Sequence, residues 1–309
     1  MKRLLIASLT LLLPLTGCAA LREPTDMFVI AGTALAWQDG QYRLASEMGD
    51  TGSTQEDLPK SRVFAGTGDT VSACLFDMAA RAEREIYFGK TEVLLLQETM
   101  PAPARKSALD LFLSHRDDGE VLLCALRADS PEAALSFGER QELRTSVIMG
   151  LLRDGQRRVA CRDMEAERVQ EIGAGDYYLP EITVDDTGAR LSGAAFYKDH
   201  GCLGRLEGQP VRLLCLLDGA KVQSACSLHG PGWAVWLKKA HVERSGGTLQ
   251  LVLEAAFTEG APEREAVEQY LAEMGRELFA ALREMGANPL NLPEFVTRDY
   301  RVAVTVHMP

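Results

Sequence analysis

Hydrophobic and polar positions in the first half of the chain follow two patterns that alternate along the sequence. Short apolar runs of strand length are followed by stretches in which apolar residues recur every three or four positions, the spacing of an amphipathic helix. The runs predict strands over 27–37, 41–48, 91–97 and 120–127. The periodic stretches predict helices over 71–82 and 104–114, one that starts at Pro131, and one over 139–153. Strands that alternate with helices in this way are typical of a mixed α/β layer.

The pattern of hydrophobic positions changes after Gly155, and from there predicted strands outnumber predicted helices. Strands are expected over 156–163, 177–184, 189–197, 201–206 and 301–307, with a hairpin that joins 233–243 to 248–258. Short helices are expected over 164–172 and 210–217. The clearest helix covers 262–285, with an apolar stripe, acidic residues in its first turn and Gly286 at its end. We predict that this stripe packs on a sheet built from the hairpin and the closing strand.

The size and composition are those of a folded protein with more than one domain. The 309 residues fit two or three domains, and 46% hydrophobic with 25% charged residues is the balance of a globular chain. The net charge of -11 makes this a poor candidate for nucleic-acid binding, because such binding depends on neutralising phosphate charge. Only 6% of the residues are aromatic, which also argues against a base-stacking platform.

The first 18 residues have the parts of a secretory signal: a basic start, an apolar run over 4–13, and small residues before Cys18. Residues 15–18 (LTGC) resemble the lipobox of bacterial lipoproteins. In that class the Cys thiol carries a diacylglyceryl group and the chain is cut just before it. Residues 1–17 would then be the signal peptide, and Cys18 the lipid anchor. An uncleaved membrane anchor, or a signal cut elsewhere, is the alternative.

Six further cysteines leave two interpretations open. An even number in an exported chain is compatible with a disulfide framework. The neighbours of Cys124 and Cys215 are continuous apolar runs, and Cys74 shares a helical stripe with apolar residues. Free cysteine packs as a small hydrophobic residue, so buried thiols are the favoured interpretation. The absence of a CxxC pair gives no support to a redox site or a zinc ribbon.

No motif in the chain predicts catalysis, a metal or another cofactor. The histidines are too far apart for a paired metal motif, and no GxSxG occurs. Residues 199–202 (DHGC) could ligate zinc, but they are typical of a hairpin tip. Residues 66–70 (GTGDT) could hold an anion at a helix start, but they lack the Lys of a P-loop, and a loop that leads into a helix cap is favoured.

Several stretches, in order, resemble the GerAC or Ger(x)C family, the lipoprotein C subunits of spore nutrient germinant receptors. After the lipobox, residues 21–48 resemble the opening of the family, and 66–96 resemble its helix and following strand most closely. The matching stretches further along are 191–199, 203–206 and 263–285. The chain also departs from the pattern, with Ala19 and Ala20 in place of a Trp-Asp pair and Lys90 in place of a His. The tryptophans usual before the closing strand are missing, and 288–292 replace an Asp- and Gly-rich stretch.

The resemblance implies an elongated α+β protein of three mixed-sheet domains with flanking helices, which follow the lipoprotein signal. The expected domains are 18–155, 156–228 and 229–309. The implied protein is not an enzyme: it is anchored on the extracytoplasmic face, in the spore inner membrane, and assembles with two integral-membrane subunits. A lipid-anchored solute-binding protein is the alternative, and it should have two similar lobes around a deep cleft.

Contacts with partner proteins are expected around Tyr87 and Phe88 and around Asp199 and His200. For Tyr87 and Phe88, core packing is the more ordinary use.

Overall fold

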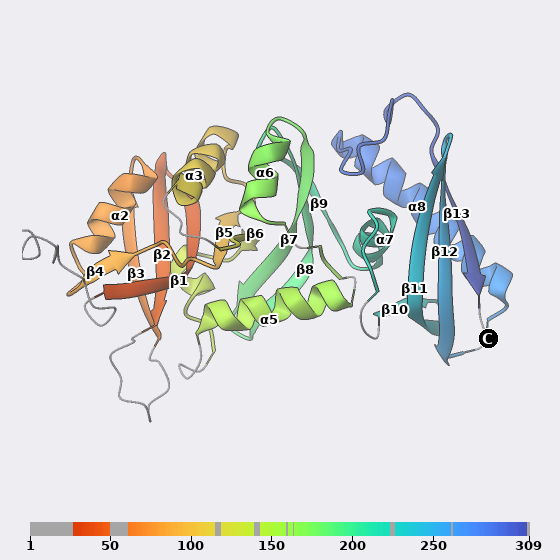
Figure 1. Ribbon diagram of the computed structural model, residues 1–309, viewed down its shortest axis with the longest axis horizontal. Helices are drawn as coiled ribbons and strands as arrows, with labels where there is room; N and C mark the ends of the chain where they lie inside the picture. The colour runs from red at the N-terminus through yellow and green to blue at the C-terminus, as the bar shows by residue number, and fades with distance from the viewer. Residues whose placement is uncertain are drawn as a thin grey trace, which may run out of the picture.

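The computed structural model describes residues 27–49, 61–114, 119–138, 143–158, 160–162, 164–222, 226–260 and 262–307. These residues form two sheets side by side along an elongated molecule (Figure 1). The predicted signal peptide 1–17, Cys18 and most of the polar stretch 49–62 lie outside the described residues.

The larger sheet has nine strands, and most of them lie in the order β3-β2-β1-β5-β6-β7-β8-β9. The strands are β1 (Met27–Gln38), β2 (Gln41–Gly49), β3 (Ser61–Gly68), β4 (Glu85–Tyr87), β5 (Val93–Gln97), β6 (Leu122–Arg127), β7 (Asp176–Asp185), β8 (Gly188–Lys198) and β9 (Gly201–Glu207). Strands β1, β5, β6 and β7 are parallel neighbours, and β4 pairs with the start of β1. Antiparallel hairpins extend the sheet on both sides.

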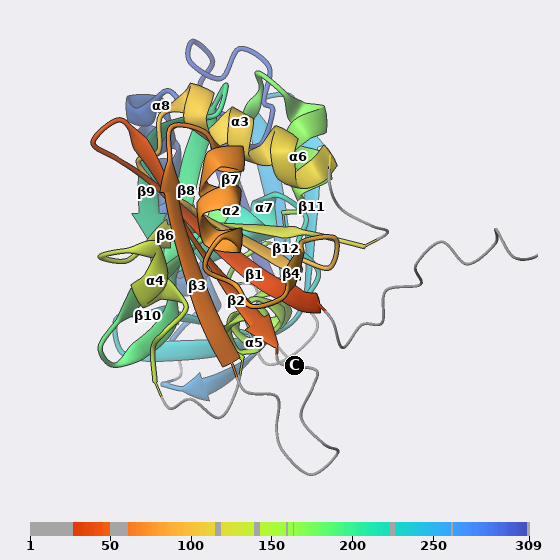
Figure 2. The ribbon, with the colours of Figure 1, turned by 90° about the vertical axis from the view of Figure 1, so that its left-hand side faces the viewer.

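Helices cover both faces of this sheet, because both faces of its central strands are apolar. One face packs against α2 (Val71–Ala79), α3 (Ala102–Ser114) and α6 (Ala166–Ile172), as Figure 2 shows. The other face packs against α4 (Pro131–Ala134) and α5 (Arg144–Arg157). Alternate residues of β6 serve the two cores: Leu123 and Ala125 face α3, whereas Leu122 and Cys124 face α5.

The smaller sheet has the order β10-β11-β12-β13 and carries the long helix predicted from the sequence. Its strands are β10 (Cys226–Gly230), β11 (Trp233–Ser245), β12 (Thr248–Glu259) and β13 (Arg301–His307), and its helices are α7 (Gln209–Leu217) and α8 (Arg264–Met285). The predicted packing of α8 is confirmed, since Leu271 and Leu278 share one core with Leu251 and Val304. Helix α8 approaches strand β13 closely at Gly275, where a Cβ atom would lie 2.5 Å from Cγ2 of Val302.

The α+β class is confirmed, but the described residues form two sheets where three were expected. The segment 156–228 does not build its own sheet, because β7 pairs in parallel with β6 and continues the first one. Pairing satisfies the backbone groups that β6 would otherwise leave open at a buried edge. The domain boundaries at 155 and 228 stay a prediction.

Two local predictions were wrong. The glycines at 66 and 68 indicated a loop, yet they belong to β3: they let α2 pack directly on the strand, and a Cβ on Gly66 would lie 2.2 Å from the carbonyl oxygen of Cys74. The predicted strand over 156–163 overlaps the end of α5, which continues to Arg157. Gly155 has no side chain, so the helix can pack close to Leu191 at this point. The predicted cap of α2 is confirmed, as Thr70 Oγ1 accepts a hydrogen bond from the Ala73 amide at 3.1 Å.

Candidate functional site

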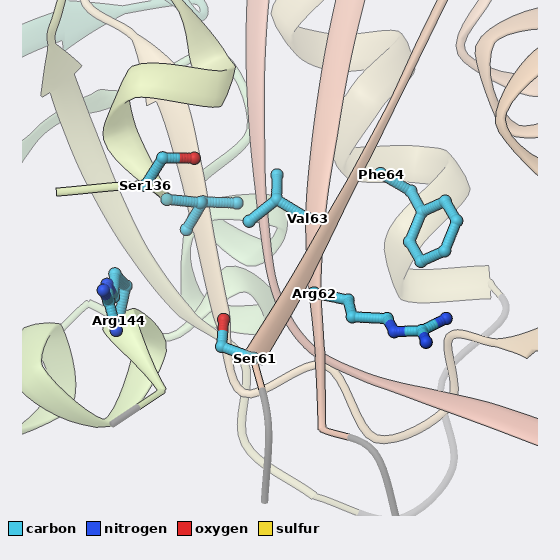
Figure 3. A pocket seen from close by; sticks show the side chains of 7 residues that line it. Ser61, Arg62, Val63, Phe64, Ser136 and Arg144 are labelled. Atoms are coloured by element: carbon cyan, nitrogen blue, oxygen red, sulfur yellow. The ribbon is translucent and has the colours of Figure 1, made fainter. Parts of the chain in front are cut away.

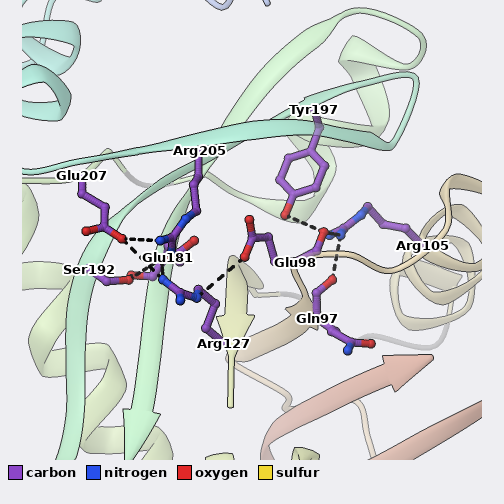
Figure 4. A network of polar contacts seen from close by, with 9 residues as sticks. All are labelled: Gln97, Glu98, Arg105, Arg127, Glu181, Ser192, Tyr197, Arg205 and Glu207. Atoms are coloured by element: carbon purple, nitrogen blue, oxygen red, sulfur yellow. Dashed lines mark hydrogen bonds and ion pairs between the residues drawn. The ribbon is translucent and has the colours of Figure 1, made fainter. Parts of the chain in front are cut away.

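The most concentrated group of charged side chains lies where β5, β6 and β7 end. Because these strands are parallel, their carboxyl ends meet at one edge of the sheet, the usual position of ligand crevices in such sheets. Glu98 follows β5, Arg127 ends β6, and Glu181 lies in β7. Arg205 and Glu207 from β9 join them, and these five residues are called the sheet-edge cluster below (Figure 4).

Glu181 is the centre of the sheet-edge cluster and is fully buried. Its Oε1 accepts a hydrogen bond from Ser192 Oγ at 2.6 Å and lies 3.4 Å from Arg127 Nη1 and 3.3 Å from Arg205 Nη1. Its Oε2 has no hydrogen-bond partner among the described residues. Burial raises the pKa of Glu181, and the hydrogen bond from Ser192 opposes that rise. The carboxyl group therefore holds its charge at a cost, which the two guanidinium groups reduce.

The outer members of the sheet-edge cluster reach solvent. Glu207 Oε1 lies 2.8 Å from Arg205 Nη2 and 3.4 Å from Arg127 Nη1, and the two arginine side chains are 39% (Arg127) and 35% (Arg205) exposed. Beside them is a cleft of about 350 Å³ lined by parts of β5, β6 and β7. Thr183 lines this cleft, and its buried Oγ1 has no hydrogen-bond partner among the described residues. Arginines on such a rim can bind carboxylates or backbone carbonyls of another molecule.

A second buried charged residue, Arg105 of α3, stabilises the backbone just after β5, at the same edge of the sheet. Its Nη2 donates hydrogen bonds of 2.8 Å to the carbonyl oxygens of Gln97 and Glu98, just after β5 (Figure 4). Its guanidinium lies 4.1 Å from the ring centroid of Tyr197, within cation–π range. Tyr197 stacks on Tyr177, and burial raises the pKa of Tyr177 to about 12, so both rings remain neutral phenols near pH 7.

The predicted contact residues occupy two separate places. Tyr87 and Phe88 are half-buried beside the start of β1, and the Phe88 ring packs edge-on at 6.2 Å from Phe112. Asp199 and His200 form the two-residue turn between β8 and β9, both with positive φ, as the hairpin-tip interpretation predicts. Strand β8 lies four positions from β1 in the sheet, a separation of ~19 Å at the usual strand spacing.

Within the turn, only one of the two side chains faces solvent. Asp199 is exposed, whereas His200 is 6% exposed and its Nδ1 lies 3.2 Å from the Tyr177 hydroxyl. Burial lowers the pKa of His200, so the neutral imidazole is favoured. The use of all four residues as contact points stays a prediction.

A separate hollow of about 370 Å³ lies between β3 and the start of α5 (Figure 3). Its polar side chains are engaged in holding the fold: Ser61 donates to Glu47, Arg62 pairs with Glu83, and Arg144 donates to the carbonyl oxygen of Phe137. Glu47 is buried at the base of α5, where its carboxylate accepts the amides of Arg144 and Thr145 at 2.7 and 2.6 Å. This arrangement caps a helix, because the carboxylate accepts the amides that begin α5.

The described part of the chain shows the state of its cysteines and whether its side chains could form a metal site. There, Cys74, Cys124, Cys161, Cys215 and Cys226 are buried and Cys202 is exposed, and no disulfide joins these six residues. No group of three His, Cys, Asp or Glu side chains within the described ranges could hold a metal ion. Nor does any helix in those ranges have the length and apolarity to cross a bilayer.

Sequence reasoning missed the sheet-edge cluster, Glu47 and Arg105. The signal that existed was a charged residue at a core-facing position, as with Glu181 inside the apolar run 177–184 and Arg105 between apolar helix positions. The partners of each lie far along the chain, since Arg127 and Glu181 are 54 residues apart. Only strand pairing brings them together.

Residues 21–158 match the spore germination protein N-terminal domain. This match supports the resemblance to the Ger(x)C family that the sequence indicates. Its fold is similar to the crystal structure of the GerBC protein, with a TM-score of 0.50 and 15% sequence identity over 90% of this chain and 96% of that one. No curated protein matches its sequence. The two sheets differ in strand number and order in the described ranges, unlike the two similar lobes expected of a solute-binding protein.

Proposed function

We propose that this protein is the lipid-anchored C subunit of a germinant receptor and acts with two integral-membrane subunits on the extracytoplasmic face of the spore inner membrane. The observation that carries the proposal is the spore germination domain over 21–158, joined to a fold like that of GerBC along most of the chain. Such a subunit supports the response to small nutrients through protein contacts, without a catalytic step.

The anchor in this proposal is a diacylglyceryl group on Cys18. The residue follows a short apolar run and lies nine positions before Met27, the first residue of β1, so the folded body would begin close to the membrane. Two or more acyl chains give stable attachment, whereas one chain is marginal. Cys18→Ala should yield an uncleaved precursor that incorporates no labelled fatty acid. Incorporation of label into that variant would contradict the assignment of Cys18.

The surfaces that suit protein contact are the β8–β9 turn at Asp199 and the rim of the sheet-edge cluster. Partly exposed arginines such as Arg127 and Arg205 are enriched in interfaces, where their planar groups bind carboxylates and carbonyls. A lipid anchor raises the effective concentration of these surfaces next to integral-membrane partners. Weak individual contacts then suffice for assembly.

Co-purification from detergent-solubilised spore membranes tests the proposal. Two multi-spanning proteins should accompany the tagged chain, and Asp199→Lys should reduce their yield several-fold. The matched control is Asp186→Lys, an equally exposed aspartate in the turn at the other end of β8, which should retain them. If the protein purifies alone and turns over a substrate, the receptor role and the non-catalytic role are both wrong. Equal loss of partners from both variants would remove Asp199 from the contact surface.

A further inference from the structure

Helix α2 exposes an unusually apolar outer face. Phe76 is 77% exposed, and Ala79 and Ala80, one turn further on, are exposed as well. The opposite side of the helix is already packed in the core through Cys74 and Met78. A helix on the surface of a globular protein normally presents charged or polar residues on its outer side. The outer face of α2 therefore has the composition of a surface that meets something apolar.

This surface continues beyond the helix. Ser72, one turn before Phe76, borders an apolar hollow of about 410 Å³ between the first turns of α2 and α3. Pro101 and Pro103 are exposed on its far side, and Trp37 lines it. The one acidic residue of α2, Asp77, is held by the Thr67 amide at 3.0 Å and by Arg81 at 2.8 Å. These two contacts neutralise the charge that would otherwise oppose burial of this face.

The same end of the molecule carries the start of β1. After α2 the chain turns into β4, and Glu85 of β4 pairs with Met27. Figure 2 faces this end and shows α2 in the foreground with β3 and β4 beside it. Met27 lies nine positions after Cys18, and an extended chain of that length spans at most ~32 Å. An anchor at Cys18 therefore keeps this end, and not the end at α8, next to the bilayer.

Charge does not distinguish this end from the rest of the molecule. Residues 61–92, which build β3, α2 and β4, contain four basic and five acidic residues, and this net charge of -1 (4 − 5) is close to the average of a 309-residue chain with a net charge of -11. Two of the basic residues, Arg62 and Arg84, lie over the ring of Phe28 beside the start of β1. The choice of a lipid surface therefore rests on the apolar face of α2 and on the position of the anchor.

We propose that the outer face of α2 rests on the lipid surface, with the Phe76 ring at the boundary between headgroups and acyl chains. The inference rests on the proposed anchor at Cys18. Aromatic rings favour this boundary, and a small apolar face that binds lipid weakly alone binds well when an anchor holds it there. The contact fixes the orientation of the body, so that the sheet-edge cluster and the β8–β9 turn are presented to neighbouring membrane proteins.

The test uses the full-length protein reconstituted into phosphatidylethanolamine–phosphatidylglycerol vesicles whose acyl chains are brominated near the headgroup. Phe76→Trp places a reporter on the proposed contact. Val296→Trp is the matched control, because Val296 is 75% exposed and lies in the loop between α8 and β13, beside Asp176 and Lys198 of the distant strands β7 and β8. The added fluorescence at position 76 should be quenched at least twofold by brominated lipid, and that at position 296 should not.

Equal quenching at both positions, or none at position 76, overturns the inference. Quenching at position 76 that appears only when integral-membrane subunits are added also overturns it, because a protein would then be the occupant. Circular dichroism of each variant checks the fold. Mass spectrometry of the reconstituted protein reports separately whether Cys18 carries lipid. Unmodified Cys18 in protein still held by its leader would disprove the anchor, and the quenching would still judge the contact of α2.

Discussion

Replacement of Glu47 by glutamine should destabilise helix α5 more than any surface change. Leu143, at the start of α5, supplies no capping side chain, so a carboxylate from β2 does the capping instead. Oε1 accepts the Arg144 amide at 2.7 Å and Ser61 Oγ at 2.6 Å, and Oε2 accepts the Thr145 amide at 2.6 Å and its hydroxyl at 2.7 Å. All four donors point at one buried group.

The magnitude follows from what glutamine cannot do. An amide NH₂ in place of either oxygen faces an N–H donor, so one hydrogen bond to a charged group is lost and a buried N–H is left unpaired. Such a loss costs about 1.5–3 kcal/mol. The negative charge at the helix N-terminus contributes up to about 2 kcal/mol more in a buried geometry. We therefore expect Glu47→Gln to lower the free energy of unfolding by roughly 2–5 kcal/mol.

Thermal and urea unfolding measure this directly, with Glu254→Gln as the control. Glu254 pairs with Lys239 on the surface, where both side chains are largely exposed and the pair is worth about 0–1 kcal/mol. At about 2 °C per kcal/mol, Glu47→Gln should lower Tm by roughly 4–10 °C. Hydrogen exchange of the amides in α5 should accelerate first. A Tm shift no larger than that of the control, with α5 amides still protected, would refute the capping role of Glu47.

Four further outcomes are expected. Leu278→Asp places a carboxylate in the core shared by α8 and the small sheet and should cost several kcal/mol, so an unmoved melting curve would contradict that packing. Gly275→Ala should lower the free energy of unfolding by ~1–3 kcal/mol through its clash with β13. Gly150→Ala, on the open side of α5, should raise it by ~0.5–1 kcal/mol, and equal effects of the two changes would contradict the close approach at Gly275. Because burial raises the folded-state pKa of Glu181, its contribution to stability is present below the ordinary value of about 4.3 and is lost as pH rises through the raised value. The stability of wild type relative to Glu181→Gln should therefore fall in urea titrations as pH rises above about 4.3, and a flat or rising difference would contradict the expected sign. Thiol labelling of the native protein should modify Cys202 rapidly and the five buried cysteines only on unfolding, and reductant should leave the circular dichroism unchanged.

Local periodicity was sufficient for most single elements of this protein. The stripe of α8 and the Asp199–His200 turn each depend on residues within a few positions of one another, and each was predicted from them. The predicted packing of α8 on the small sheet also followed, because the helix and its strands are neighbours in the chain and each has one apolar face.

Elements whose character depends on a distant partner were misread. The glycines of β3 indicated a loop because their use, the close approach of α2, is visible only after packing. Residues 156–157 were predicted to begin a strand, but they continue α5. The residue against which this end of α5 packs is Leu191, which lies 36 positions beyond Gly155 and so outside the local pattern. In each case the deciding contact lies outside the window over which periodicity is measured.

The amino-acid sequence by itself determined most of the helices and strands, the faces that they bury, and the resemblance to the Ger(x)C family. Only the tertiary structure decided that β7 pairs with β6, so that nine strands share one sheet, and that Glu181 meets Arg127 and Arg205 at its edge. The physical reason is that an open strand edge accepts any strand of suitable register, and side-chain pattern does not specify which. The choice is made by the sum of packing and charge contacts between segments far apart in the chain, and the candidate site exists only after that choice.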